Sequence, residues 1–144
     1  MLDRLSKEVR SRVMSRIRGK NTQPELRVRT FLHAAGFRYR LHDMRLPGRP
    51  DIVLPARRTC VFVHGCFWHG CRKCADGRRK VLSNLSYWGP KIRRNRKRDG
   101  ENSRALRRSG WCVFEIWECD TENRMELRKL LRSIRNCGSS ARKR

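Results

Sequence analysis

Hydrophobic residues recur every three or four positions in residues 2–18 and residues 127–134, and this spacing predicts two amphipathic helices. A third helix is predicted over residues 22–35, where threonine, proline and glutamate resemble a capping box and a glycine follows the last turn. Residues 87–108 are expected to be helical in part, with Gly100 as an interruption. Helices therefore lie near both ends of the chain and in its middle.

Between these helices, shorter stretches have the pattern of β-strands. Residues 37–42 alternate apolar and polar side chains, as a half-exposed strand does. After a turn cluster at residues 46–50, residues 51–54 and 59–63 read as two strands of a hairpin joined by an Ala-Arg-Arg turn. Residues 111–117 read as a further, buried strand. The order of helix, strands, basic helix, strand and helix predicts an α/β fold with a mixed central sheet flanked by helices.

The chain has 144 residues, which is enough for one domain with its own core. Residues 1–20 are expected to be a basic N-terminal arm or helix and residues 21–136 the folded domain. Residues 137–144 are expected to be a disordered basic tail. The spacing of residues 2–18 leaves two interpretations equally open, a helix that packs on the core or an arm that lies along DNA.

The charge of the chain is strongly one-sided. Lys and Arg number 37 against 13 Asp and Glu, which gives a formal net charge of +24, and nine of the basic residues lie between Lys91 and Arg108. A merely soluble surface does not require such an excess, so we expect a nucleic acid partner. No apolar run reaches membrane-spanning length and no signal-peptide pattern is present, so we expect a cytoplasmic protein with no membrane partner.

Three of the seven cysteines lie close together in the sequence. Cys71 and Cys74 have the C-x-x-C spacing of a zinc site, and Cys66 is near enough to join them. Cys119, which follows the last predicted strand, is the best distant candidate for a fourth ligand. Four thiolates would complete a tetrahedral structural zinc site with no open position. The alternative is a set of free cytosolic thiols.

The other three cysteines are expected to play no part in this site. Cys60 and Cys112 lie within apolar strands and are expected to be buried core thiols, and Cys137 is expected to be incidental. An odd number of cysteines argues against a secreted disulfide scaffold.

Acidic and histidine side chains supply a second candidate site. Asp51 starts a strand after a proline and Glu25 lies on the preceding helix, and a carboxylate can hold the Mg²⁺ that phosphodiester hydrolysis uses. From spacing alone, a turn-capping role for Asp51 is the more common one. His64 and His69 flank the cysteine-rich loop and could act as acid and base or as metal ligands.

Aromatic residues stand beside the basic and cysteine-rich segments. Phe67 and Trp68 lie in the loop between the histidines, and Trp88 precedes the basic helix. Such side chains can stack on bases or wedge between them. For Trp111 and Trp117, core packing in a strand is the better interpretation.

Taken together, these motifs resemble the very short patch repair (Vsr) endonuclease family over residues 10–119. The matching segments are Leu-Pro-Gly-Arg-Pro-Asp at 46–51, Val-His-Gly-Cys-Phe-Trp-His at 63–69, Tyr-Trp at 87–88 with Lys91 and Asn95, Gly-Trp at 110–111 and Trp-Glu-Cys at 117–119. The shared order and separations make the match more specific than any single motif.

The resemblance implies a restriction-endonuclease-like fold, related to the PD-(D/E)XK nucleases, in a single domain with a structural zinc site. It implies an enzyme that nicks duplex DNA 5′ to the T of a T·G mismatch, left when 5-methylcytosine is deaminated, with Mg²⁺ as the catalytic cofactor and Zn²⁺ as the structural one. Expected partners are mismatched double-stranded DNA and the mismatch-repair protein MutL, and the enzyme is expected to act as a monomer at the bacterial nucleoid.

The resemblance also assigns roles to individual residues. Asp51 and the main-chain oxygen of Val63 would hold Mg²⁺, His69 would be the principal acid and base with His64 supporting it, and Glu25 would be an acidic residue of the active site. The residues expected to contact DNA are Phe67, Trp68 and Trp88 as wedges, Lys91 and Asn95 near the mismatched bases, and Arg10, Arg12 and Arg16 on the backbone.

The chain departs from the family at three positions. Cys71 stands where some members use a histidine zinc ligand, Cys74 is displaced by one residue, and Val63 replaces a polar residue. Two other functions also fit the sequence: a non-catalytic zinc-stapled DNA-binding module, and a related nuclease with a broader mismatch range. A basic RNA-binding protein is a third and more distant alternative.

Overall fold

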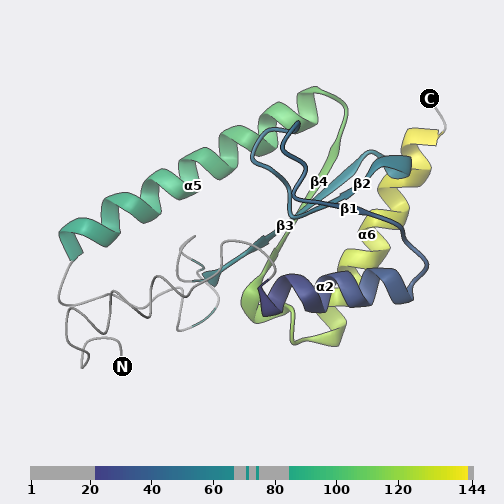
Figure 1. Cartoon of the computed structure of the whole chain (residues 1–144), viewed down its shortest axis with the longest axis horizontal. Coiled ribbons are helices and arrows are strands. Elements are labelled where there is room, and N and C mark those ends of the chain that lie inside the picture. The colour runs from purple at the N-terminus through teal and green to yellow at the C-terminus, as the bar shows by residue number, and fades with distance from the viewer. Residues whose placement is uncertain (1–21, 67–70, 72–73, 75–84, 143–144) are drawn as a thin grey trace.

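The computed structural model describes residues 22–66, Cys71, Cys74 and residues 85–142 (Figure 1). The predicted helix at residues 2–18, and with it the whole N-terminal arm, lies outside these described residues. Four strands form one mixed sheet in the order β1-β2-β3-β4. The strands are β1 (Arg40–Leu41), β2 (Ile52–Leu54), β3 (Thr59–His64) and β4 (Cys112–Trp117).

Three α-helices are described around this sheet: α2 (Gln23–Ala34), α5 (Leu85–Arg108) and α6 (Arg124–Arg142). Strand β2 pairs antiparallel with both β1 and β3, whereas β4 pairs with β3 in parallel after the crossover through α5. The predicted α/β fold with a mixed sheet flanked by helices is therefore confirmed. No helix in the described segments is long and apolar enough to cross a membrane.

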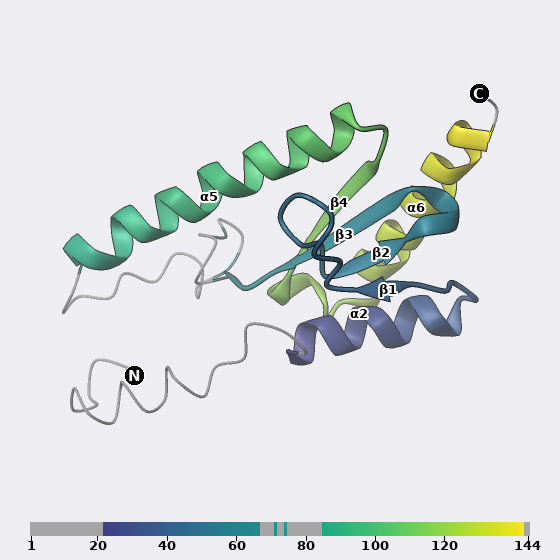
Figure 2. The same cartoon turned by 45° about the horizontal axis from the view of Figure 1, so that its top comes forward.

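The two faces of the sheet pack against different helices (Figures 1 and 2). Helices α2 and α6 cover one face, and α5 crosses the other. Alternation along the strands separates the buried side chains, because successive residues of a strand point to opposite faces. The α2 and α6 side holds Val28, Leu32, Ile52, Leu54, Val61, Ile116, Leu127, Leu130 and Ile134, and the α5 side holds Val53, Cys60, Phe62, Leu106 and Val113.

The local signals in the sequence account for most element ends. Helix α2 begins after Thr22, whose hydroxyl accepts the Glu25 N–H at 3.4 Å, and it ends before Gly36, which has a φ of +93°. A three-residue 3₁₀-helix, η2 (Pro55–Arg57), joins β2 to β3, so the predicted hairpin is confirmed. Arg58, which ends η2 and leads into β3, has a left-handed φ of +47°.

Two elements differ from the sequence prediction in the middle of the chain. Of the strand expected at residues 37–42, only Arg40–Leu41 forms, because β1 pairs with just two residues of β2. Gly100 does not interrupt α5, which runs unbroken for 24 residues. A single glycine costs a helix about 1 kcal/mol relative to alanine. On the same helix, Leu106 is fully buried and Ser103 is 4% exposed against the sheet, and these contacts outweigh that cost.

The C-terminus also differs from the prediction. Residues 137–142, which belong to the tail expected to be disordered, continue α6 to Arg142, and residues 143–144 lie outside the described residues. Cys112 was expected to be a buried core thiol and Cys137 to be incidental. Instead the two form a disulfide between β4 and α6. Cys137 lies three residues beyond the fully buried Ile134, so it falls on the face of α6 that meets the sheet. The local sequence pattern predicted neither the length of α6 nor its link to β4.

Leu106 joins α5 to the sheet, and its replacement tests this packing. Its side chain is 0% exposed among Val53, Cys60, Phe62 and Val113. We expect Leu106→Ala to lower the free energy of unfolding by about 2–5 kcal/mol, since the deletion leaves a cavity. Leu26→Ala on α2, where the leucine is 40% exposed, is the matched control and should change it by less than about 0.5 kcal/mol. Urea unfolding measures both, and equal effects would contradict the described packing.

Candidate active site and metal centre

Asp51 lies where the hairpin strands and β1 meet. Its main-chain carbonyl accepts the His42 N–H at 3.3 Å, just beyond β1. Its side-chain Oδ2 accepts the Val63 N–H at 2.7 Å. Both bonds come from neighbouring strands, so the carboxylate is held in one orientation at the end of β2. The turn-capping role that spacing alone favoured is not what the structure shows for this side chain.

Glu25 reaches the same place from α2. Its side chain is only 3% exposed, and its Oε2 accepts hydrogen bonds from Arg29 Nη2 and His42 Nε2, each at 3.0 Å. The side chain therefore points away from the helix start that it was expected to help cap. His42 Nε2 also lies 4.0 Å from Asp51 Oδ1. Glu25, His42 and Asp51 thus offer three ligand atoms within 4.8 Å of one another.

His42 is a member of this cluster that sequence reasoning did not select. Its only signal in the sequence is its place at the end of an alternating stretch, and this predicts a strand residue. The pairing of residues 41 and 52 brings it beside Asp51, and that register depends on the tertiary structure. A register of strands cannot be read from one strand alone.

The environment of Asp51 disfavours its charge. The pKa of Asp51 is raised from 3.8 to about 6, and burial is the main cause. The hydrogen bond from Val63 lowers this pKa, whereas the neighbouring Glu25 carboxylate raises it. The nearby His42 and His64 lower it by smaller amounts. An isolated carboxylate in this place would therefore be part-protonated near pH 6, and a bound cation would favour its ionised form.

His64 is the last residue of β3, and it is 4% exposed. Its ring lies parallel to Phe62 at 6.0 Å between centroids and tilted against Trp117 at 5.3 Å. Its Nε2 is 3.7 Å from Glu115 Oε2, and Glu115 Oε1 accepts a hydrogen bond from Ser103 of α5 at 3.1 Å. The contact with His64 is the main cause that lowers the pKa of Glu115.

Glu115 and Ser103 are further residues that sequence reasoning missed. Residues 111–117 were predicted as a buried strand, and Glu115 was not selected from it. In the structure its side chain is 38% exposed and lies on the face of β4 toward α5, between a serine and a histidine.

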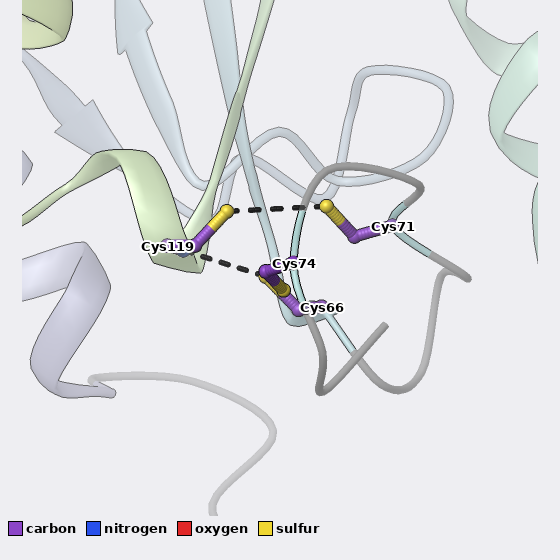
Figure 3. Close-up of side chains that lie close together, drawn as sticks. All are labelled: Cys66, Cys71, Cys74 and Cys119. Atoms are coloured by element: carbon purple, nitrogen blue, oxygen red, sulfur yellow. Dashed lines mark hydrogen bonds between the residues drawn. The ribbon is translucent and has the colours of Figure 1, made fainter. Parts of the chain in front are cut away.

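The four cysteines chosen from the sequence come together at one end of the sheet (Figure 3). Cys66 follows β3, Cys119 lies in the 3₁₀-helix η3 (Glu118–Asp120) that follows β4, and Cys71 and Cys74 come from the segment between. All four Sγ atoms lie within 4.8 Å of one another, and those of Cys71 and Cys119 are 3.9 Å apart. A tetrahedral zinc with bonds of about 2.3 Å separates its sulfurs by about 3.8 Å.

Without a cation, these thiols resist ionisation. Burial raises the pKa of Cys119 to about 11 and that of Cys66 further still, and the neighbouring cysteines contribute to both. One bond favours thiolate on Cys66, since its Sγ accepts the Cys119 N–H at 3.4 Å. A divalent cation would displace the remaining protons and make the cluster stable in its ionised form.

The structure places the DNA-contact candidates only in part. Trp88, Lys91 and Asn95 all fall on α5, where Asn95 accepts a hydrogen bond from Arg98 at 2.9 Å. His69, Phe67, Trp68, Arg10, Arg12 and Arg16 lie outside the described residues.

Comparison with known proteins finds a matching family model and several similar proteins. Residues 2–76 match the family model described as DNA mismatch endonuclease Vsr. The chain is 49% identical over 134 residues to the type II nicking enzyme V.XorIIP of Xanthomonas oryzae, an alignment that covers 93% of this chain and 97% of the relative. It is 43% identical to the type II nicking enzyme V.NmeAIP of Neisseria meningitidis (94% and 99% covered) and 35% identical to the DNA mismatch endonuclease Vsr of Escherichia coli K12 (88% and 80% covered).

The raised pKa of Asp51 predicts a pH dependence of stability. Between pH 3.8 and about 6 the folded chain retains a proton that the unfolded chain loses, so ionising Asp51 lowers stability as the pH rises through this window. We expect the free energy of unfolding of Asp51→Asn, relative to the unchanged protein, to rise by up to about 3 kcal/mol across that window. Urea unfolding in magnesium-free buffer measures it, and parallel pH curves for the two proteins would contradict the expectation.

Proposed function

The chain belongs to the family of the DNA mismatch endonuclease Vsr, and from that premise we propose that it nicks duplex DNA 5′ to the T of a T·G mismatch. As a member, it is a DNA endonuclease that acts on mismatched DNA. The finer proposal is that its substrate is the mismatch left by deaminated 5-methylcytosine, as in very short patch repair. The observation that carries it is that the carboxylate of Glu25 on α2 lies close to that of Asp51, the residue before β2, whose side chain is bonded to Val63 near the end of β3.

We further propose that the fold is of the restriction-endonuclease type. The support is a mixed four-stranded sheet with helices on both faces, in which an antiparallel hairpin presents an acidic residue at its edge. In such an arrangement the site lies where strand ends and a neighbouring helix converge, and here Asp51 and Glu25 occupy that place.

For the catalytic cation, we propose Mg²⁺ held by Asp51 and by the main-chain carbonyl of Val63. The N–H and C=O of one residue in a strand point toward the same neighbouring strand. The Val63 N–H is bonded to Asp51, so its carbonyl faces the same edge of β3. When bound there, Mg²⁺ would neutralise charge on the scissile phosphate and lower the pKa of an attacking water.

Proton transfer is assigned to two histidines. His69 is proposed as the principal acid and base and His64 as its support, five residues earlier. His64 is held between two aromatic rings and the carboxylate of Glu115, so its orientation is constrained before DNA arrives. A fixed imidazole loses little entropy on reaching the reactive geometry.

DNA binding is proposed to use charge for affinity and aromatic wedges for selectivity. Most of the basic residues of α5 are exposed and can contact phosphates, as can Arg10, Arg12 and Arg16 of the arm. Phe67, Trp68 and Trp88 would wedge beside the mismatch while Lys91 and Asn95 contact its bases. Unstacking costs a few kcal/mol and less at a wobble pair, so deformability contributes to selectivity.

The four-cysteine cluster is proposed to hold a structural Zn²⁺. The sulfur separations suit a tetrahedral site in which every position is filled by the protein. Such a site would join the ends of β3 and β4 and so position the loop that carries His69. We propose that the protein acts as a monomer in the bacterial cytoplasm, at the nucleoid, with MutL as a partner in repair.

Replacing Asp51 tests the catalytic assignment. We expect Asp51→Ala to lower the rate of nicking of a T·G duplex in Mg²⁺ by at least about 10³-fold, because the cation loses its carboxylate. Binding to the same duplex should change by less than about threefold. Gel assays of nicking and binding, with a circular dichroism check of folding, measure both.

The control for this experiment is Glu126→Ala, whose carboxylate pairs with Lys129 on the same helix, α6. It should nick at the unchanged rate. Mismatch binding by the unchanged protein without any nick would favour the non-catalytic DNA-binding module. Nicking at several mismatches would favour a nuclease of broader range.

Removing one cysteine tests the zinc assignment. The purified protein should contain about one zinc per chain, and Cys119→Ala should lose it and unfold at a lower temperature. Cys60→Ala removes a buried thiol from the α5 side of the core and should keep its zinc. Elemental analysis and thermal unfolding measure the two effects. Equal zinc content in the two variants would exclude the cysteine cluster as the site.

A further inference from the structure

His42 lies at the centre of the carboxylate cluster, yet the proposed magnesium site gives it no role. It follows β1 with a φ of +47°, a left-handed conformation that histidine adopts more readily than most residues. Its main-chain N–H is bonded to the carbonyl of Asp51. This backbone geometry turns the imidazole toward the two carboxylates instead of continuing the alternation of the strand.

The separations within the cluster suit coordination. His42 Nε2 is 3.0 Å from Glu25 Oε2 and 4.0 Å from Asp51 Oδ1. In an octahedron with metal–ligand bonds of about 2.1 Å, adjacent ligands are about 3.0 Å apart and opposite ligands about 4.2 Å apart. Three donor atoms at such distances can share one cation with little movement of their side chains.

Two hydrogen bonds from outside the cluster keep its carboxylates oriented. Asp51 Oδ2 is bonded to the Val63 N–H, and this bond turns Oδ1 toward His42. Glu25 Oε2 accepts bonds from Arg29 Nη2 and His42 Nε2, and a cation shared by Glu25 and His42 would replace the second of these bonds. Backbone and guanidinium therefore act as supports behind the ligand atoms, as partners behind metal ligands commonly do.

We propose that His42, together with Glu25, is a direct ligand of the divalent cation that Asp51 holds, and that its imidazole favours a first-row transition metal over Mg²⁺. This inference rests on the proposed function, because it concerns the same site. Mg²⁺ prefers oxygen ligands and retains several waters, whereas imidazole suits the transition metals. A donor set of two carboxylates and one imidazole accommodates both classes of cation and binds the transition metals more tightly.

The alternative is that His42 only donates a hydrogen bond to Glu25, since 3.0 Å is also an ordinary hydrogen-bond length. The two roles differ in one observable. A ligating nitrogen couples magnetically to a paramagnetic ion, and a hydrogen-bonded nitrogen outside the coordination sphere does not do so at the same strength.

Mn²⁺ is the probe for this test, because it accepts oxygen and nitrogen ligands and has little affinity for thiolates. Pulsed electron paramagnetic resonance of the Mn²⁺-loaded full chain should show coupling to directly bound nitrogen. Labelling histidine with ¹⁵N should change that coupling in the manner of imidazole. His42→Gln should abolish it, whereas His33→Gln, which replaces an exposed histidine of α2, should retain it.

Affinity supplies a second measurement. His42→Gln should weaken Mn²⁺ binding by about tenfold or more while changing Mg²⁺ binding by less than about threefold, as calorimetry would show. Nitrogen coupling that persists in His42→Gln, or its absence from the unchanged protein, would overturn the assignment. A parallel loss of Mn²⁺ and Mg²⁺ affinity would also overturn it.

The two proposals can fail separately. If the unchanged protein nicks T·G duplex in Mg²⁺ but shows no nitrogen coupling with Mn²⁺, only the role of His42 is wrong. If Mn²⁺ shows nitrogen coupling that is lost in both His42→Gln and Asp51→Ala, but no duplex is nicked, the metal site stands and the endonuclease function fails.

Discussion

Strand β3 is the constraint on which the sheet, the carboxylate cluster and the cysteine cluster all depend. It is hydrogen-bonded along both edges, and its side chains are buried against α2 and α6 on one face and α5 on the other. A shift of one residue would exchange these faces, so the register is fixed. That register alone presents the Val63 N–H to Asp51, directs His64 toward Glu115, and places Cys66 two residues beyond the strand.

Electrostatics explains why a chain of formal net charge +24 keeps carboxylates at its centre. Burial of Asp51 outweighs the favourable field of its basic neighbours, and its pKa rises to about 6. Glu25 is stabilised by contacts with Arg29 and His42, and these leave it pointing at Asp51. Two neighbouring carboxylates repel each other, and a cation bound between them would remove that repulsion. The exposed arginines of α5 are free of that constraint and provide a surface for a polyanion.

The cysteines divide into groups with different chemistry. Four gather where β3 and β4 end, two link β4 to α6, and Cys60 remains a buried thiol of the α5-side core. These three groups include all seven cysteines, and only one disulfide is among them. Thiolates and carboxylates lie in separate clusters near the same end of β3, and ligand softness would sort two metals between them without competition.

The sequence by itself determined the order of elements, the hairpin, the ends of α2, the cysteine set and the family, because these depend on local spacing and on the identities of neighbouring residues. It also brought out Glu25 and Asp51 as candidates, and the resemblance then gave them expected roles. Tertiary structure decided where His42, Glu115 and the Cys112–Cys137 pair lie. It also decided that α5 runs through Gly100. In each case the deciding energy comes from residues distant in the chain, through strand register and packing, and no local pattern encodes it.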